Sequence, residues 1–247
     1  MFYTYKLPVS VARLPFVETY ANYKVTVCPK LICLDGCNYV GKSTVLPKVQ
    51  QFFESKGNKV LTLKQPFPQN LEFIKEQLLS CKGDVERGDH SNYYLQNKLA
   101  QTFRYDRRLM DEALNTPEAK EANIIVLDRG ELSTLVCQQN SYRFTSIQPG
   151  LTLNLTAPMR VILQRFEARP SRGELDPSQI ELSLRHSEFR SKTRALKESF
   201  GILPYAQVFD TVNAELAQVL DAIEGYYTLY NFDNSELKYP ELNIKFK

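Results

Sequence analysis

Near the start of the chain stands the segment Gly36-Cys37-Asn38-Tyr39-Val40-Gly41-Lys42-Ser43-Thr44. Its order of glycine, any four residues, glycine, lysine and serine is the pattern of a phosphate-binding P-loop. The apolar run 30–35 before it predicts a strand, and the spacing of apolar residues over 44–55 predicts a helix. Because the pattern requires this strand, loop and helix context, we expect the backbone N–H groups of the segment to bind the phosphates of a nucleotide.

Lys42 and Ser43 add side-chain chemistry to this loop. The Lys42 ammonium is a movable cation for phosphate oxygens, and the Ser43 hydroxyl is placed to bind the Mg²⁺ that accompanies a nucleoside triphosphate. A P-loop enzyme needs a second carboxylate near that metal, usually at the end of a neighbouring apolar strand. Asp128 follows the apolar run 124–127. The sequence therefore predicts ATP and Mg²⁺ as cofactors, with Ser43 and Asp128 holding the metal.

Arg129 comes directly after that carboxylate. An arginine at this position could bridge the donor and acceptor phosphates and stabilise the charge of the transferred group, which makes it a candidate catalytic residue beside Lys42. An ordinary ion pair at the end of a strand is the alternative interpretation.

The pattern of strand and helix continues along the chain. Further apolar runs at 59–63, 123–128, 151–155 and 206–210 alternate with stretches of helical spacing at 91–114, 158–169, 177–199 and 214–230. Alternation of this kind predicts an α/β fold with a parallel sheet of five strands covered by helices on both faces, a three-layer P-loop fold. We expect one domain over residues 30–231, preceded by an irregular or extended arm, 1–29, and followed by a polar tail, 232–247.

Composition excludes several other classes of protein. The 247 residues are 43% hydrophobic, which is enough for one large core, and 31 basic against 28 acidic residues leave a formal charge of only +3. That charge favours small-molecule partners over duplex nucleic acid. No apolar run is long enough for a membrane span and no secretory signal precedes the domain, so we expect a soluble, cytoplasmic protein without a membrane partner. Five cysteines and two histidines lack metal-ligand spacing.

Two motifs carry a resemblance to a known family. Asp128-Arg129, three residues, Ser133, four residues and Gln138 resemble the signature of thymidylate kinases. Asp35 and Asn38, around the first glycine of the loop, stand where this family carries an acidic and a second polar residue. The resemblance covers roughly residues 30–230. It implies the nucleotide kinase fold, phosphorylation of a nucleotide by ATP, and a homodimer.

The same resemblance implies the residues that bind the acceptor. Lys64-Gln65-Pro66 falls where the family has Arg-Glu-Pro, so Lys64 would be the cation for the acceptor phosphate. Tyr94 would stack on the acceptor base and Lys98, four residues later on the same helical face, would contact it. A half-buried tyrosine and a solvated lysine are the alternative for this pair. The remaining implied acceptor contacts are Asn38, Arg129, Ser133 and Gln138.

Two departures from the family bear on the acceptor. Deoxynucleoside kinases generally place their catalytic base in the glutamate that Gln65 replaces, and glutamine is no useful base, so the substitution favours a monophosphate acceptor. Gly130 and Cys137 replace residues that are commonly aromatic. We therefore predict a roomier acceptor pocket and a modified or different pyrimidine as one possible acceptor.

A group of arginines resembles the lid of these kinases, a mobile segment that closes over the phosphates. These residues are Arg165, Arg169 and Arg172, of which Arg169 and Arg172 are candidate catalytic groups; for Arg165 a basic surface loop is the alternative. Taken together, the sequence predicts ATP-dependent phosphorylation of a deoxynucleoside monophosphate, most simply dTMP to dTDP. A deoxynucleoside kinase, a kinase of a modified pyrimidine nucleotide and a nucleotide-binding P-loop protein without catalysis are the alternatives.

Overall fold

The structure is a computed structural model of the whole chain. It describes residues 3–6, 24–87, 92–130, 132–133, 136, 147–169, 177–199, 206–210, 217–221 and 223–224. Within these residues no helix is long and apolar enough to cross a membrane.

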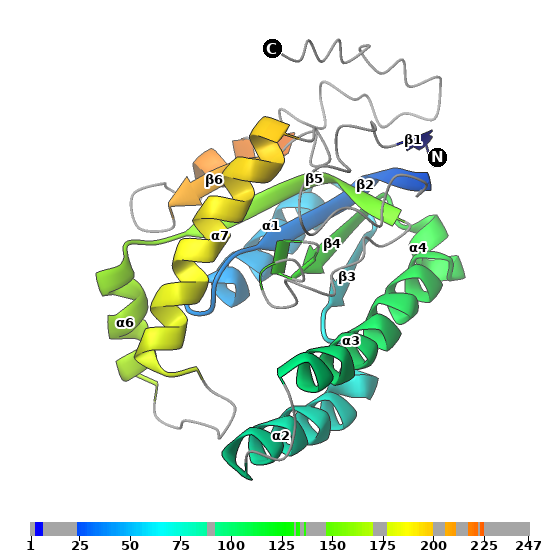
Figure 1. The fold of residues 1–247 in the computed structure, drawn as a ribbon. Helices are drawn as coiled ribbons and strands as arrows, with labels where there is room; N and C mark the ends of the chain where they lie inside the picture. The colour runs from blue at the N-terminus through cyan, green and yellow to red at the C-terminus, as the bar shows by residue number, and fades with distance from the viewer. Residues whose placement is uncertain are drawn as a thin grey trace.

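A six-stranded sheet forms the centre of the described fold (Figure 1). Five of its strands pair in parallel in the order β3-β4-β2-β5-β6, and β1 pairs antiparallel with β2. The strands are β1 (Tyr3–Lys6), β2 (Lys24–Asp35), β3 (Val60–Lys64), β4 (Ile124–Asp128), β5 (Ile147–Thr156) and β6 (Ala206–Asp210). The α/β fold with a parallel sheet is therefore confirmed, while β1 and the first residues of β2 extend the sheet into the predicted arm.

Helices cover both faces of this sheet because successive residues of its strands point to opposite sides. Ile32 and Leu34 of β2 belong to one core cluster, and Leu31 and Cys33 belong to the other. The first cluster is completed by apolar residues of α1 (Lys42–Ser55) and by Val219, Leu220 and Ile223, and the second by apolar residues of α3 (Asn92–Leu114) and α4 (Pro117–Glu121). Each fully buried leucine or isoleucine contributes about 1.5–3 kcal/mol, so the continuous apolar strands drive formation of this layered core.

The helices are α1 (Lys42–Ser55), α2 (Leu71–Arg87), α3 (Asn92–Leu114), α4 (Pro117–Glu121), α6 (Met159–Glu167) and α7 (Gln179–Ser199). In Figure 1, α1 lies behind the central strands, α7 crosses in front of them, and α2 and α3 run side by side. Of the predicted helix 214–230, only residues 217–221, 223 and 224 are described.

Helix α2 was not predicted. Prolines at 66 and 68 are typical of a loop, but Pro68 stands in the first turn of a short 3-10 helix, η2 (Pro68–Asn70), that leads directly into α2. Proline is well tolerated there because its missing N–H would have no partner in a first helical turn. Ile74 and Cys81, seven residues apart on one face, are both buried.

Candidate functional site

The P-loop connects the end of β2 to the start of α1. Gly36 has a φ of +132°, and an added Cβ would lie 2.2 Å from the carbonyl oxygen of Leu155, so only glycine fits at this position. Gly41, with a φ of +105°, is the N-cap of α1, and its carbonyl accepts hydrogen bonds from Thr44 N and Val45 N. The two glycines therefore let the backbone turn sharply and direct the N-terminus of α1 toward the loop.

Lys42 lies folded inside this loop. Its side chain is only 6% exposed, and Nζ donates hydrogen bonds to the carbonyl oxygens of Gly36 (2.7 Å) and Cys37 (2.8 Å). The pKa of Lys42 is lowered to about 8, chiefly by burial and then by the Arg129 guanidinium, while Asp35 and Asp128 act in the opposite direction. The charged form of Lys42 is thus weakly stabilised by the protein alone, and a bound anion would favour it strongly.

This pKa predicts that nucleotide binding takes up a proton in mildly alkaline solution. Free protein loses the Lys42 proton as the pH rises through about 8, whereas the phosphates of a bound nucleotide beside Nζ raise the pKa of Lys42 and retain the proton. Calorimetric titration with ADP in two buffers of different ionisation enthalpy should show uptake approaching one proton near pH 9, about half at pH 8 and little near pH 7. Equal uptake at about pH 7 and 9 would contradict the assignment.

Asp35 joins the P-loop to the loop that follows β4. The side chain is fully buried at the end of β2. Its carboxylate accepts hydrogen bonds from the backbone N–H groups of Gly36 (3.1 Å), Gly130 (3.3 Å), Leu132 (3.0 Å) and Ser133 (3.1 Å), and from the Ser133 hydroxyl. One carboxylate thereby orders two segments that are distant in the sequence.

Asp128 ends β4, next to the end of β2 in the parallel register. The side chain is 4% exposed, and among the described residues its Oδ1 atom has no hydrogen-bond partner. Ser43, on the exposed start of α1, lines the same cavity as Asp128. A buried, unpaired carboxylate oxygen near a hydroxyl fits Mg²⁺, which prefers oxygen ligands and usually binds through one or two carboxylates plus substrate phosphates.

Arg129 adopts a conformation that only glycine adopts easily, with a φ of +70°. Such a backbone costs about 1–3 kcal/mol and persists where its surroundings hold it in place. Here the backbone N–H of Arg129 donates to Leu34 O (3.0 Å), and the next residue is held by Asp35. The guanidinium is directed back to the P-loop, where Nη2 donates to Asn38 Oδ1 (2.8 Å).

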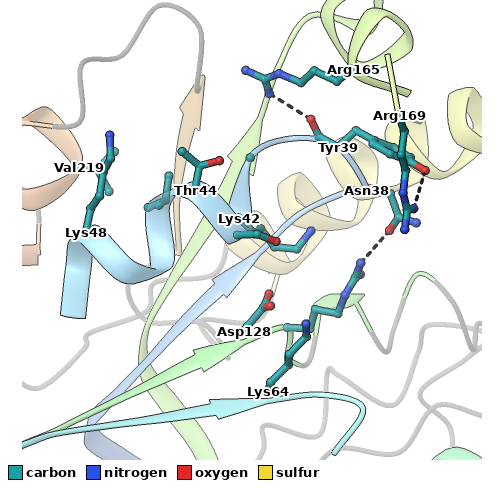
Figure 2. A pocket seen from close by; sticks show the side chains of 14 residues that line it. Asn38, Tyr39, Lys42, Thr44, Lys48, Lys64, Asp128, Arg165, Arg169 and Val219 are labelled. Atoms are coloured by element: carbon teal, nitrogen blue, oxygen red, sulfur yellow. Dashed lines mark hydrogen bonds between the residues drawn. The ribbon is translucent and has the colours of Figure 1, made fainter. Parts of the chain in front are cut away.

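Two arginines, Arg165 in α6 and Arg169 just beyond the end of that helix, also contact the loop, both through Tyr39 (Figure 2). Arg165 Nη1 donates to the Tyr39 carbonyl oxygen (3.0 Å), and Arg169 Nη1 donates to the Tyr39 hydroxyl (3.3 Å). Arg172 and the rest of the predicted lid, 170–176, lie outside the described residues.

These groups surround one cavity of about 810 Å³. Among the described residues that line it, six are lysine or arginine and one is acidic, so the cavity suits a polyanion. Its lining comes from the P-loop and α1, the ends of β3 and β4, helix α6 and the segment around residue 219: Asn38, Tyr39, Gly41, Lys42, Ser43, Thr44, Val45, Lys48, Lys64, Asp128, Arg129, Arg165, Arg169 and Val219.

Most of the sequence-predicted phosphate and metal residues thus meet at one place. Lys48 was not predicted; it lies one helical turn after Thr44 and therefore on the same face of α1. This four-residue spacing from a P-loop residue is the feature of the sequence that could have predicted Lys48 as a further cation of the site.

Three other predicted residues, Cys37, Val40 and Ser133, are not among the described residues that line this cavity. Cys37 and Val40 are buried. The Cys37 Sγ atom lies 3.9 Å from Leu182 O, and burial raises the pKa of its thiol although Lys42 lowers it. Ser133 is buried against Asp35. Their proposed contacts to a ligand remain predictions.

Lys98 faces α2 and not the P-loop. Its Nζ atom donates to Ser80 Oγ (2.8 Å) and lies 3.7 Å from Asp84 Oδ2. The side chain of Tyr94 and the whole of Gln138 lie outside the described part of the chain. Of the pair predicted to contact the acceptor base, only the Lys98 side chain is therefore described.

The absence of a side chain at Gly130 does not enlarge the cavity. A Cβ at this position would lie 2.5 Å from Cys33 Sγ, inside the core between β2 and β4. For Gly130 the predicted roomier pocket is therefore wrong, because close packing against Cys33 occupies the space. Cys137, the second residue behind that prediction, lies outside the described residues.

Comparison with known proteins gives a consistent result. No protein-family model matches the chain. The thymidylate kinase of Thermosipho africanus is 23% identical over 207 residues, 77% of this chain and 96% of that protein. The probable thymidylate kinase of Methanosphaera stadtmanae is 27% identical over 119 residues, 48% of this chain and 55% of that protein. The thymidylate kinase of Neisseria gonorrhoeae is 23% identical over 212 residues, 80% of this chain and 98% of that protein. The chain is thus similar to thymidylate kinases over most of its length.

Proposed function

We propose that this protein transfers the γ-phosphate of ATP to a deoxynucleoside monophosphate, with dTMP as the preferred acceptor. The observation that carries the proposal is the cavity of about 810 Å³, where a P-loop, a buried carboxylate and six cationic side chains converge. A reaction between two phosphate-bearing substrates requires this excess of positive charge, because the substrates repel each other and the transferred group carries negative charge.

The donor nucleotide would lie along the P-loop. The loop N–H groups and the Lys42 ammonium would bind its phosphates, and Ser43 and Asp128 would hold Mg²⁺, which supplies charge neutralisation at the phosphate oxygens when bound. Arg129, Arg165 and Arg169 line the same cavity and would stabilise charge on the transferred group.

Lys64 supports a phosphate-bearing acceptor. It lies at the end of β3 directly beside Asp128 in the parallel register, and it lines the cavity. The next residue, Gln65, is buried, and its side-chain amide is no proton acceptor for a sugar hydroxyl. A monophosphate needs no base there, because its ionised phosphate is already the nucleophile.

An ADP-release assay tests this function. With Mg²⁺ and ATP, the protein is offered deoxynucleosides and their monophosphates in parallel, including 5-substituted pyrimidines. We expect turnover of dTMP to exceed that of thymidine by at least about 10²-fold, because only the monophosphate uses the cation at Lys64. Preferential turnover of thymidine would identify a nucleoside kinase instead, and ATP binding without transfer to any acceptor would indicate a P-loop protein without catalysis.

A further inference from the structure

Tyr39 occupies an unfavourable backbone position in the centre of the P-loop. Its φ is +66°, in the left-handed region that glycine adopts at little cost and a bulky aromatic residue adopts rarely. A strained backbone conformation of this kind persists only where the surrounding contacts hold the residue in place.

The backbone carbonyl and the ring of Tyr39 contact helix α6, and its hydroxyl contacts Arg169, just beyond the end of that helix. The carbonyl oxygen accepts a hydrogen bond from Arg165 Nη1 (3.0 Å), and the hydroxyl accepts one from Arg169 Nη1 (3.3 Å). The ring packs edge-on against Phe166, with centroids 5.4 Å apart and an interplanar angle of 81°. In Figure 2, dashed lines join the guanidinium groups of Arg165 and Arg169 to Tyr39.

The chemistry of these contacts suits arginines that must remain available to phosphate. A carbonyl and a hydroxyl are neutral acceptors, so they orient a guanidinium without cancelling its charge. Arg169 is exposed, so without a holding contact its long side chain would spread over many rotamers.

We propose that Tyr39 is a positioning residue that fastens α6 to the P-loop and holds Arg165 and Arg169 over the phosphate cavity. This role rests on the proposed phosphoryl transfer, and it assigns to Tyr39 a side-chain task beyond the backbone binding expected of any P-loop residue. Ordering the arginines before the nucleotide binds reduces the conformational entropy lost on binding.

A double-mutant cycle tests the role. Tyr39→Phe removes the hydroxyl but keeps the carbonyl bond to Arg165 and the ring contact to Phe166. We expect kcat to fall by about three- to tenfold, the range for loss of one ordinary hydrogen bond, because this bond is long and exposed, with a smaller change in KM for ATP. In an Arg169→Ala background the same substitution should have no further effect, whereas in an Arg165→Ala background its effect should persist in full.

The different effects of Tyr39→Phe expected in the two arginine backgrounds distinguish a positioning role from a general structural effect. Equal effects of Tyr39→Phe in the Arg169→Ala and Arg165→Ala backgrounds, or no effect in the wild type, would overturn the proposal. Tyr39→Gly relieves the positive φ and provides a second variant should the phenylalanine variant fold poorly. Its kcat should fall further, and combined replacement of both arginines should abolish its effect; an effect that survives their replacement would count against the role.

The cycle remains informative if the proposed function fails. Should no acceptor be phosphorylated, the dissociation constant of ATP is measured for the same set of proteins. Coupling between Tyr39 and Arg169 in that constant would support the positioning role without any transfer, and strictly additive changes would refute it.

Discussion

Replacement of Lys42 by alanine is expected to lower kcat/KM for phosphoryl transfer by about 10³-fold or more, the size of effect seen when a charge-stabilising group is removed from a reacting site. Lys42 is the only cationic side chain that the described P-loop, residues 36–44, contains. It already lies within 2.8 Å of two carbonyl oxygens of that loop, so a small movement brings it to a phosphate bound there.

Loss of activity in this variant should occur without loss of the fold. Burial disfavours the charged form of Lys42, so removing the side chain eliminates an unfavourable charge together with its two hydrogen bonds. Thermal unfolding should therefore change little. Lys59→Ala is the matched control, because its ion pair with Glu121 is exposed and lies outside the cavity, where such pairs contribute little. Retention of more than about a tenth of the activity by the Lys42 variant would refute its role.

Asp35→Ala should cause the largest loss of stability, about 3–5 kcal/mol in the free energy of unfolding, because it leaves several buried donors without their acceptor. Asp35→Asn should cost nearly as much, since its NH₂ group must face N–H donors that now point at an oxygen. Chemical denaturation measures these differences through the midpoint and slope.

The same substitutions should also slow catalysis by the molecules that remain folded. Asp35 holds the backbone that follows Arg129, so its loss releases Arg129 from the strained φ that directs the guanidinium to Asn38. Ser133→Ala serves as the graded control. It removes only the hydroxyl donor, and we expect it to destabilise by about 1 kcal/mol. An Asp35→Asn protein within about 1 kcal/mol of the wild type would contradict the account.

The phosphate site was predictable because its signals are local. The P-loop pattern is contiguous, and the apolar runs that end in Asp35 and Asp128 are short buried strands. The carboxyl ends of adjacent parallel strands lie together in this fold class, so a carboxylate at the end of each run is expected near the loop. In the structure β2 and β4 are indeed neighbours, and Leu34 pairs with Asp128.

Features that depend on distant contacts were not predictable. β1 pairs with residues about 20 positions along the chain, and no local pattern marks that pairing. The spacing of Tyr94 and Lys98 indicates a shared helical face but not its orientation; packing of α3 against α2 turned Lys98 toward Ser80 and Asp84. Gly130 suggested extra space, yet Cys33 occupies the position that a side chain would take.

Residue order alone thus specified the class of fold and the phosphate-binding chemistry, because both follow from short-range periodicity and from a contiguous motif. The contacts that give this site its particular form arise between segments about 90 to 130 positions apart: Asp35 with the loop after β4, Arg129 with Asn38, and Tyr39 with the end of α6 and Arg169. Such contacts depend on how strands and helices are packed, and a one-dimensional pattern carries no information on which distant side chains will meet.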